Sequence, residues 1–263
     1  RPGWTASVSD FVIQIQGAVM CVGGPSIPEI ATSKKATNEE LGGWELHAKT
    51  TGQVDLFAED EADCLRLIRR ALSYFPNNVN EFPPALSPPS TSGRIENILD
   101  LVPADPRQVY DMRRLIDAIC DEGSVLELKP FYDGSLITAL ARIEGRVVGI
   151  LANNPKITAG AMGPSACEKA TSFICLCDSF HIPLVFLHDT PGFFVGRRAD
   201  ERAMPLKIMT WISALQQTTV PRISVIVRKS YRRAHCNRAG RNSSCDKPLA
   251  WPTAHVSFLR PPH

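Results

Sequence analysis

The sequence has no run of about 18 apolar residues, the length that a membrane-spanning helix needs. Its first residues also lack the basic and then apolar stretch of a secretion signal, so neither a membrane anchor nor an export signal is expected. An excess of one charge is missing too, because 29 Lys and Arg face 27 Asp and Glu, for a net charge of +2. This balance argues against a nucleic-acid-binding protein and against a partner of strongly acidic molecules.

Common catalytic signatures are absent as well. The sequence contains no Walker phosphate loop, no GxGxxG dinucleotide motif and no recognisable Ser-His-Asp arrangement. Eight cysteines are present, but four of them lie in apolar, helix-like stretches, as small buried side chains do: Cys64, Cys120, Cys175 and Cys177. No pair has the spacing of a zinc ribbon. We therefore expect reduced thiols and a cytoplasmic protein.

One group of residues near the C-terminal end offers metal-binding side chains: His235, Cys236, Cys245 and His255. The Cys-x8-Cys spacing within this group matches no compact zinc site. The favoured interpretation is an ordinary loop, and no bound metal is expected.

The first 75 residues predict two short strands and one helix. Residues 11–16 and 18–22 have strand patterns, and Gly23-Gly24-Pro25 ends the second. Residues 59–72 predict an amphipathic helix with acidic residues in its first turn, where the helix dipole favours them. We expect its buried face to contain Leu65, Ile68 and Leu72.

A proline-rich segment follows at residues 76–92. It contains five prolines: Pro76, Pro83, Pro84, Pro88 and Pro89. Helices and central strands do not tolerate this density of proline, so the segment is interpreted as an extended linker between two domains.

The second half of the sequence alternates strand and helix patterns. Strands are predicted at residues 136–143, 146–152, 184–187 and 223–227, and helices at residues 107–120, 167–180 and 202–216. The first two strands are joined by a tight Glu144-Gly145 turn, which is typical of a hairpin. Such alternation predicts an α/β fold.

Three loops follow buried strands, at residues 153–161, 189–196 and 229–234. Ligands of α/β sheets usually bind at the carboxyl ends of strands, so these loops predict a binding edge. Taken singly, each loop is better explained as an ordinary turn; the three together favour a site. Asp189 is interpreted as a loop cap that bonds Thr190 or nearby amides, in preference to a catalytic acid or base. A solvated role is favoured for Lys156, and structural roles for His181 and His188.

At these loops the sequence resembles a known family. Three segments carry the resemblance: ARIEGRVVGILANNPKITAGAM, CDSFHIPLVFLHDTPGFFVG and TVPRISVIVRKSY. An upstream segment, ELGGWELHAKTTGQVDLFAEDEADC, extends it. These are similar to the carboxyltransferase (β) subunits of biotin-dependent acyl-CoA carboxylases of the propionyl-CoA and acetyl-CoA type.

The resemblance implies two tandem crotonase-like (ClpP/crotonase) domains, each a superhelix of ββα units. Residues 1–75 would be the C-terminal part of the acyl-CoA domain, and residues 93–263 the first part of the carboxybiotin domain. The implied activity is CO₂ transfer from carboxybiotin, on a separate carrier, to the α-carbon of an acyl-CoA. Implied partners are a biotin carboxylase and biotin carrier subunit and further copies of this chain, with active sites at dimer interfaces and a hexamer in the family. No nucleic acid, membrane or metal is implied.

The resemblance also implies site residues. Substrate would contact the loops through Gly160, Ala161, Asp189, Thr190, Pro191, Gly192, Phe193, Gly196 and Cys236. The biotin oxyanion would be stabilised by the backbone amides of Arg233 and Ala234. No side-chain base is implied, because the ureido nitrogen takes the α-proton.

The sequence departs from the family pattern at the biotin oxyanion. The family has a Gly-Gly-Ala loop there, whereas this chain has Arg232-Arg233-Ala234. The matching loop of the acyl-CoA domain would fall at or before Arg1, so the chain is expected to be a fragment. Two alternatives stay open beside the carboxylase: a biotin-linked acyl-CoA decarboxylase subunit, and an inactive pseudo-subunit that only assembles.

Overall fold

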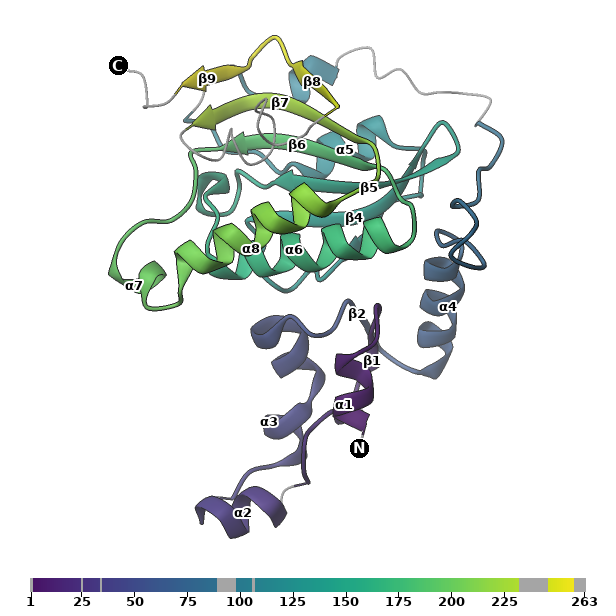
Figure 1. Ribbon diagram of the computed structural model, residues 1–263, viewed down its shortest axis with the longest axis vertical. Helices are drawn as coiled ribbons and strands as arrows, with labels where there is room; N and C mark the ends of the chain where they lie inside the picture. The colour runs from purple at the N-terminus through teal and green to yellow at the C-terminus, as the bar shows by residue number, and fades with distance from the viewer. Residues whose placement is uncertain are drawn as a thin grey trace. The chain divides into compact units, whose positions relative to one another are not determined.

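The computed structural model describes residues 2–24, 26–33, 35–88, 98–105, 107–231 and 246–257. The chain divides into two compact units. The first consists of Arg1–Ser73 and Leu128–Asp133, and the second of Tyr74–Glu127 and Gly134–His263 (Figure 1). The division between Ser73 and Tyr74 falls close to the predicted end of the first domain. Which substrate each unit binds stays a prediction.

The first unit contains short elements around a small core. In chain order they are α1 (Pro2–Ser7), β1 (Ile13–Ile15), α2 (Ser26–Thr32), α3 (Asn38–Gly42), the π-helix Leu46–Thr51, β2 (Leu56–Ala58) and α4 (Glu61–Leu72). Strand β1 pairs with β2 in parallel, with Ile13 opposite Leu56. Val12, Ala48 and Val54 form the buried centre.

The predicted second strand at residues 18–22 is wrong. Gly17 has a φ of 81°, and the Ala18 amide donates to the Ile15 carbonyl at 3.0 Å, so the chain turns directly after β1. The Met20 amide donates to the Gly42 carbonyl at 2.8 Å. This single bond to α3 takes the place of a strand ladder.

Helix α4 begins two residues later than predicted and buries a different face. Asp60 is its N-cap and accepts a hydrogen bond from the Asp63 amide at 2.8 Å. The buried residues are Leu67 and Ala71, whereas Leu65 and Leu72 are 55% and 63% exposed. The sequence contains two apolar stripes one residue apart. Contact with β1 and β2 selects the stripe of Leu67, which the spacing alone does not.

The second unit is built on a sheet of seven strands within the described residues, in the order β3-β4-β5-β6-β7-β8, with β9 also paired to β7. The strands are β3 (Leu126–Leu128), β4 (Leu136–Ile143), β5 (Arg146–Asn153), β6 (Leu184–Thr190), β7 (Arg222–Tyr231), β8 (Lys247–Ala250) and β9 (His255–Ser257). Strands β4 and β5 are antiparallel, and β5, β6, β7, β8 and β9 pair in parallel. The predicted α/β alternation is confirmed.

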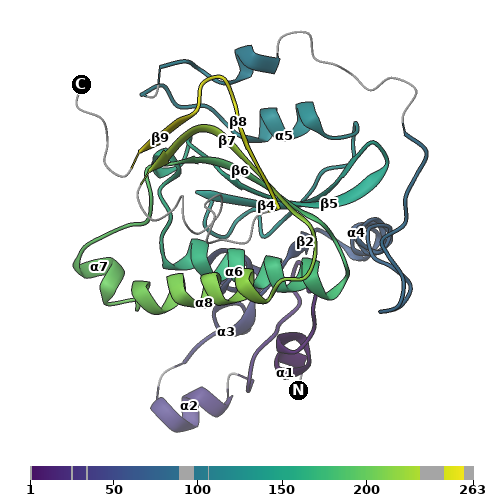
Figure 2. The same ribbon diagram turned by 45° about the horizontal axis from the view of Figure 1, so that its top comes forward.

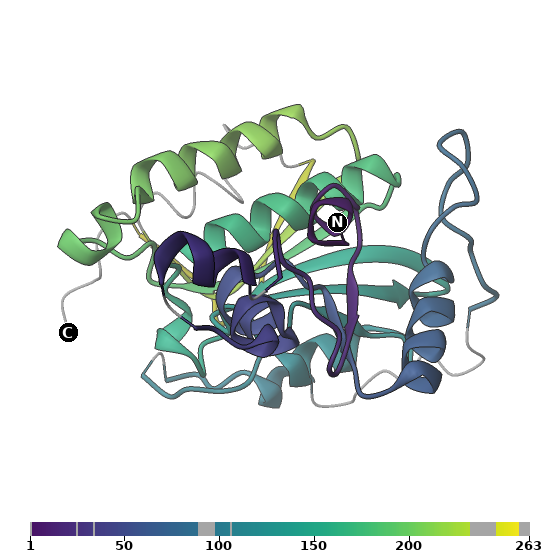
Figure 3. The same cartoon turned by 90° about the horizontal axis from the view of Figure 1, so that it is seen from below.

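Helices cover both faces of this sheet. They are α5 (Arg113–Ile119), α6 (Pro164–Ser179), α7 (Arg197–Asp200) and α8 (Met204–Gln217), with short 3-10 turns at Ile98–Leu101 and Thr158–Gly160. Helices α6 and α8 lie side by side on one face (Figure 3), and α5 lies on the other (Figure 2). A Cβ on Gly149 would come within 2.5 Å of the Cys177 sulfur, so glycine in β5 allows α6 to pack this closely.

The predicted hairpin is confirmed, and one predicted helix is much shorter than expected. Glu144 and Gly145 have φ values of 52° and 76°, as a tight hairpin turn requires. The helix predicted at residues 107–120 is reduced to α5. The Gln108 amide donates to the Asp105 carbonyl in a separate turn. The buried Arg228 guanidinium donates hydrogen bonds to the carbonyls of both Asp105 and Gln108.

The described part of the proline-rich segment has no helix or strand, as predicted, and it belongs to the second unit. Just before it, the Phe75 ring packs on Phe180 with centroids 4.6 Å apart; within it, the Val79 carbonyl contacts the His181 ring at 2.8 Å. The six cysteines in the described residues are free thiols: Cys21, Cys64, Cys120, Cys167, Cys175 and Cys177. Among the described helices, none is long and apolar enough to cross a membrane.

Candidate functional site

Three parallel strands of the second unit bring the predicted loops to one edge. Strands β5, β6 and β7 run in the same direction, so the segments at 153–161 and 189–196 emerge together. The third segment differs from the prediction. Strand β7 continues through Lys229 to Tyr231, where it pairs with β9, and residues 232–234 lie outside the described residues.

The first loop contains a strained left-handed turn. Thr158, Ala159 and Gly160 have φ values of 47°, 55° and 81°. A left-handed backbone costs about 1–2 kcal/mol at a residue other than glycine, and runs of it are rare. The Gly160 amide donates to the Ile157 carbonyl at 2.9 Å, and the Ala161 amide donates to the Thr158 carbonyl at 3.0 Å. Strained backbone of this kind often occurs where a protein binds ligands.

The two loops are bonded to each other. The Met162 amide donates to the Gly192 carbonyl at 3.1 Å, and the Phe194 amide donates to the Met162 carbonyl at 2.9 Å. Thr190 shapes the second loop, because its hydroxyl accepts from the Gly192 amide at 3.0 Å. Phe193 packs edge-on against Trp211 of α8. The loops therefore form one structure at the strand edge.

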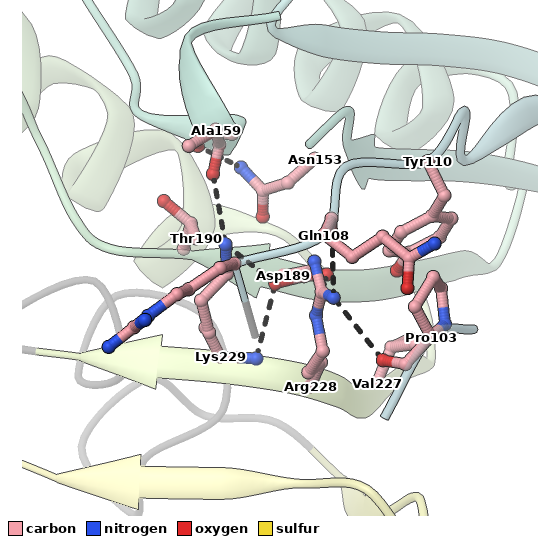
Figure 4. A network of polar contacts seen from close by, with 12 residues as sticks. Pro103, Gln108, Tyr110, Asn153, Ala159, Asp189, Thr190, Val227, Arg228 and Lys229 are labelled. Atoms are coloured by element: carbon pink, nitrogen blue, oxygen red, sulfur yellow. Dashed lines mark hydrogen bonds and ion pairs between the residues drawn. The ribbon is translucent and has the colours of Figure 1, made fainter. Parts of the chain in front are cut away.

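Asp189 does not cap its loop, contrary to the prediction. Its carboxylate is fully buried and accepts hydrogen bonds from the Arg228 Nε at 3.0 Å and from the Lys229 amide at 3.2 Å (Figure 4). The capping role belongs to the Thr190 hydroxyl. A buried carboxylate needs such partners, and neighbouring strand β7 provides them.

Arg228 was not identified from the sequence, although it organises the site. Its side chain is fully buried, and Nη1 donates to the carbonyls of Pro103, Asp105 and Gln108 at 3.3, 2.8 and 2.9 Å. The guanidinium also lies over the Tyr110 ring. The only signal in the sequence is the position of Arg228-Lys229 at the end of an apolar strand, where buried charge is unusual.

Tyr110 is the second residue that the sequence did not reveal. Burial raises the pKa of its phenol well above the ordinary value, and the charge and hydrogen bonding of Asp189 raise it further. The neutral phenol can donate a hydrogen bond to the carboxylate.

Lys229 lies between the two loops. Its Nζ is 3.6 Å from the Asp189 Oδ1 and 3.5 Å from the Ala159 carbonyl oxygen (Figure 4). Asn153 holds the same turn from β5, because its Nδ2 donates to the Gly160 carbonyl at 3.3 Å. Strands β5, β6 and β7 thus each contribute a polar side chain to this edge.

The remaining predicted residues are placed as follows. Pro191 lies between Thr190 and Gly192, and exposed Gly196 begins α7 with a φ of 111°. Lys156 is largely exposed, with its Nζ 3.4 Å from Asp111. His188 is buried and stacks on Phe186. Three predicted site residues lie outside the described residues: Arg233, Ala234 and Cys236.

Metal-binding side chains do not gather in the part of the chain that the structure describes, where no group of three or more His, Cys, Asp or Glu could hold an ion. Of the histidine and cysteine cluster named from the sequence, His255 alone belongs to the described residues.

Comparison with known proteins gives consistent matches. The family model of the carboxyl transferase domain matches residues 3–262. Uncharacterized carboxylase YngE of Bacillus subtilis is 38% identical over 253 residues, which cover 96% of this chain and 50% of that protein. The biotin-dependent acetyl-/propionyl-coenzyme A carboxylase beta5 subunit of Mycobacterium leprae is 36% identical over 265 residues, with 97% and 48% covered.

A solved structure matches the fold over nearly the whole chain. The crystal structure of transcarboxylase 12S with hydrolysed methylmalonyl-coenzyme A, described as a hexamer assembly, aligns with a TM-score of 0.93 at 34% identity. The alignment covers 97% of this chain and 51% of that chain. It confirms the predicted α/β, crotonase-like fold. The chain spans about half the length of the relatives it matches.

Proposed function

The chain belongs to the carboxyl transferase domain family, and on this premise we propose that it is the carboxyltransferase component of an acyl-CoA carboxylase. It would transfer CO₂ from carboxybiotin to the α-carbon of an acyl-CoA such as propionyl-CoA or acetyl-CoA. The observation that carries this proposal is the edge formed by β5, β6 and β7. There the turn at Gly160, the loop after Asp189 and the Lys229 ammonium group converge.

The two units are proposed to divide the substrates between them. The first unit would be part of an acyl-CoA domain, residues 76–92 a linker, and residues 93–263 part of a carboxybiotin domain. The strand edge supports this division, because all of its polar residues belong to the second unit.

The residues at this edge fit an anionic carboxylated ureido group. Asp189 is one carboxylate placed between two cations, Arg228 and Lys229. Such a cluster has positive charge to offer an anion. Gly160 lets the turn after β5 pack directly against the Asp189 carbonyl, which holds the two loops together at this edge. When bound, carboxybiotin would supply the CO₂ and the ureido nitrogen that accepts the α-proton.

The chain's own residues would then bind, orient and stabilise charge. The loops at 153–161 and 189–196 would form the walls, with Thr190, Pro191, Phe193 and Gly196 as contact residues. The backbone amides of Arg233 and Ala234 would stabilise the biotin oxyanion, with Cys236 near the acyl group. Each amide donor of such a hole typically contributes roughly 3 kcal/mol. No side-chain base is required.

Partners and location follow from the same proposal. A biotin carboxylase and a biotin carrier subunit would deliver the carboxyl group. Further copies of this chain would complete the active site at a dimer interface within a larger oligomer. A cytoplasmic location is proposed, which agrees with the buried free thiols of Cys167 and Cys177.

The direct experiment supplies a carboxylated biotin carrier and propionyl-CoA or acetyl-CoA, and measures carboxylated acyl-CoA. Arg232→Gly and Arg233→Gly are the comparison variants, because they restore the flexible residues of the family pattern. Carboxyl transfer by the native chain or by either variant supports the proposal. If no form transfers carboxyl while the chain still joins carboxylase complexes, the pseudo-subunit alternative holds. A biotin-linked decarboxylase subunit also passes the carboxyl group through biotin, so association with a membrane decarboxylase subunit in place of a biotin carboxylase would favour that alternative.

A further inference from the structure

We propose that helix α4 carries a self-association surface, through which two copies of this chain pair with their α4 helices antiparallel. The surface is the apolar stripe of Leu65, Ile68 and Leu72, which the sequence predicted to be buried and which the structure exposes. It belongs to the first unit, whereas the candidate site belongs to the second. The inference therefore does not depend on the proposed function.

The stripe has the spacing of a helix-docking face. Leu65, Ile68 and Leu72 are 55%, 37% and 63% exposed, and their i, i+3, i+7 spacing places them on one side of α4. The helix already has a core contact on a different side, where Leu67 and Ala71 are buried and α4 meets β1 and β2. Amphipathic helices use such a row of large aliphatic side chains to bind a further apolar surface.

The charges of α4 favour a second copy of the same helix as the partner. Its first turn contains Glu61 and Asp63, and its last turn contains Arg69 and Arg70. In an antiparallel pair the acidic end of each helix faces the basic end of the other, whereas a parallel pair brings like charges together. The charge pattern of α4 is therefore complementary to itself in the antiparallel orientation.

One row of the helix surface sets the register of the pair. Glu61, Leu65 and Arg69 follow one another at intervals of four residues, so they lie along one line of α4. A two-fold axis at Leu65 brings Glu61 of one copy opposite Arg69 of the other, and symmetry repeats this contact. The same axis packs each Leu65 on its counterpart, beside Ile68.

The contact is expected to be weak by itself. Stable dimers bury about 800 Å² on each partner, which is more than three aliphatic side chains supply. Exposed ion pairs determine orientation more than affinity. Association through α4 should therefore be dynamic and should depend on protein concentration, so its test has to capture a short-lived pair.

Disulfide crosslinking of the full chain tests both the surface and the orientation. Leu65→Cys, Leu72→Cys and Arg66→Cys are each made together with Cys64→Ser, which removes the neighbouring thiol. The three proteins are oxidised at equal concentration, and peptide mass spectrometry identifies disulfides between two identical peptides, which can only join two copies. Arg66→Cys is the matched control, because its side chain is 61% exposed but points to another side of the helix than Leu65.

The positions differ in what an antiparallel pair allows. With a rise of about 1.5 Å per residue, a two-fold axis at Leu65 separates the two copies of Leu72 by about 21 Å along the helices, too far for a disulfide. A parallel pair would instead bring the two copies of Leu72 together as closely as those of Leu65.

Charge exchange gives an independent measurement. Sedimentation velocity compares the native chain with Arg69→Glu and with the double variant Glu61→Arg and Arg69→Glu. The single change places like charges opposite each other and should weaken association about 3- to 10-fold, whereas the double variant should restore it. An Arg69→Glu variant that associates as the native chain does would overturn the proposal.

The expected crosslinking result is a disulfide dimer of Leu65→Cys that forms at least about five times more readily than those of Leu72→Cys and Arg66→Cys. Equal crosslinking at positions 65 and 72 would mean a parallel pair and would overturn the proposal. Crosslinking at position 65 no greater than at position 66 would show that the stripe is unused or is covered by another protein, with the same consequence. If Leu65→Cys does not fold, the charge exchange decides alone.

Discussion

Gly160 lies so close to Asp189 that a Cβ on the glycine would come within 2.3 Å of the Asp189 carbonyl oxygen. The contact joins the turn after β5 to the end of β6. Gly160 also has a φ of 81°, which disfavours every other residue. Two independent constraints therefore require glycine at this point of the candidate site.

Gly160→Ala should lower the free energy of unfolding by about 2–4 kcal/mol, from the left-handed backbone and the collision together. Urea unfolding checks this value. Gly123→Ala is the matched control, because Gly123 has a φ of 68° but open space around it, and its cost should be about 1 kcal/mol. Equal losses in both variants would show that the close approach to Asp189 does not matter.

Removing the Arg228 guanidinium should be costly, because it leaves the Asp189 carboxylate buried with fewer partners. We expect Arg228→Met to lose about 3–5 kcal/mol of unfolding free energy, and the added change Asp189→Asn to restore part of it. Arg113→Met is the control. Arg113 pairs with Glu127 at 2.6 Å, but its side chain is 36% exposed, so its loss should be about 0–1 kcal/mol. Similar losses for both arginines would refute the structural role of Arg228.

The raised pKa of Tyr110 predicts a loss of stability in alkali. The folded chain keeps the phenol neutral, whereas the unfolded chain ionises it near its ordinary pKa of about 10. The contribution of Tyr110 is therefore complete below about pH 10 and is lost as the pH rises further towards the folded pKa. Between about pH 9 and pH 11, the unfolding free energy of the native chain should fall more steeply than that of Tyr110→Phe. Parallel curves would show that Tyr110 is not protected by burial and Asp189.

The corrected face of α4 gives a prediction in the first unit. Leu67 is 7% exposed and Leu65 is 55% exposed, although both belong to apolar stripes of the same helix. Leu67→Ala should destabilise the chain by about 2–4 kcal/mol, and Leu65→Ala by less than about 1 kcal/mol. Thermal or urea unfolding distinguishes the two. A larger loss for Leu65→Ala would restore the face predicted from the sequence.

Much of the second unit was predictable, because its local signals agree with its packing. Strands β4 and β5 flank a Glu144-Gly145 turn whose two positive φ values match its residue types. Strand β6 is apolar through Leu184–Leu187 because both of its faces are covered by helices. Parallel pairing of β5, β6 and β7 then places the predicted loops at one edge without further information.

The remaining features depend on contacts between distant residues, which spacing does not encode. Arg228 reaches carbonyls more than a hundred positions earlier in the chain, and this contact explains why residues 107–112 do not join α5. The same guanidinium donates a hydrogen bond to the Asp189 carboxylate, which the sequence had predicted to cap its own loop. On α4, two apolar stripes were possible, and contact with β1 and β2 selected one.

The central claim is that the strand edge containing Asp189 and Lys229 serves a carboxyl transfer to or from biotin. The most direct measurement is the transfer of label from carboxyl-labelled malonyl-CoA to free biotin by this chain, with and without biotin and with Lys229→Met beside the native residue. The account predicts loss of label from malonyl-CoA that depends on biotin and falls at least about tenfold in Lys229→Met. Loss of label that is independent of biotin, or no loss at all, would contradict it.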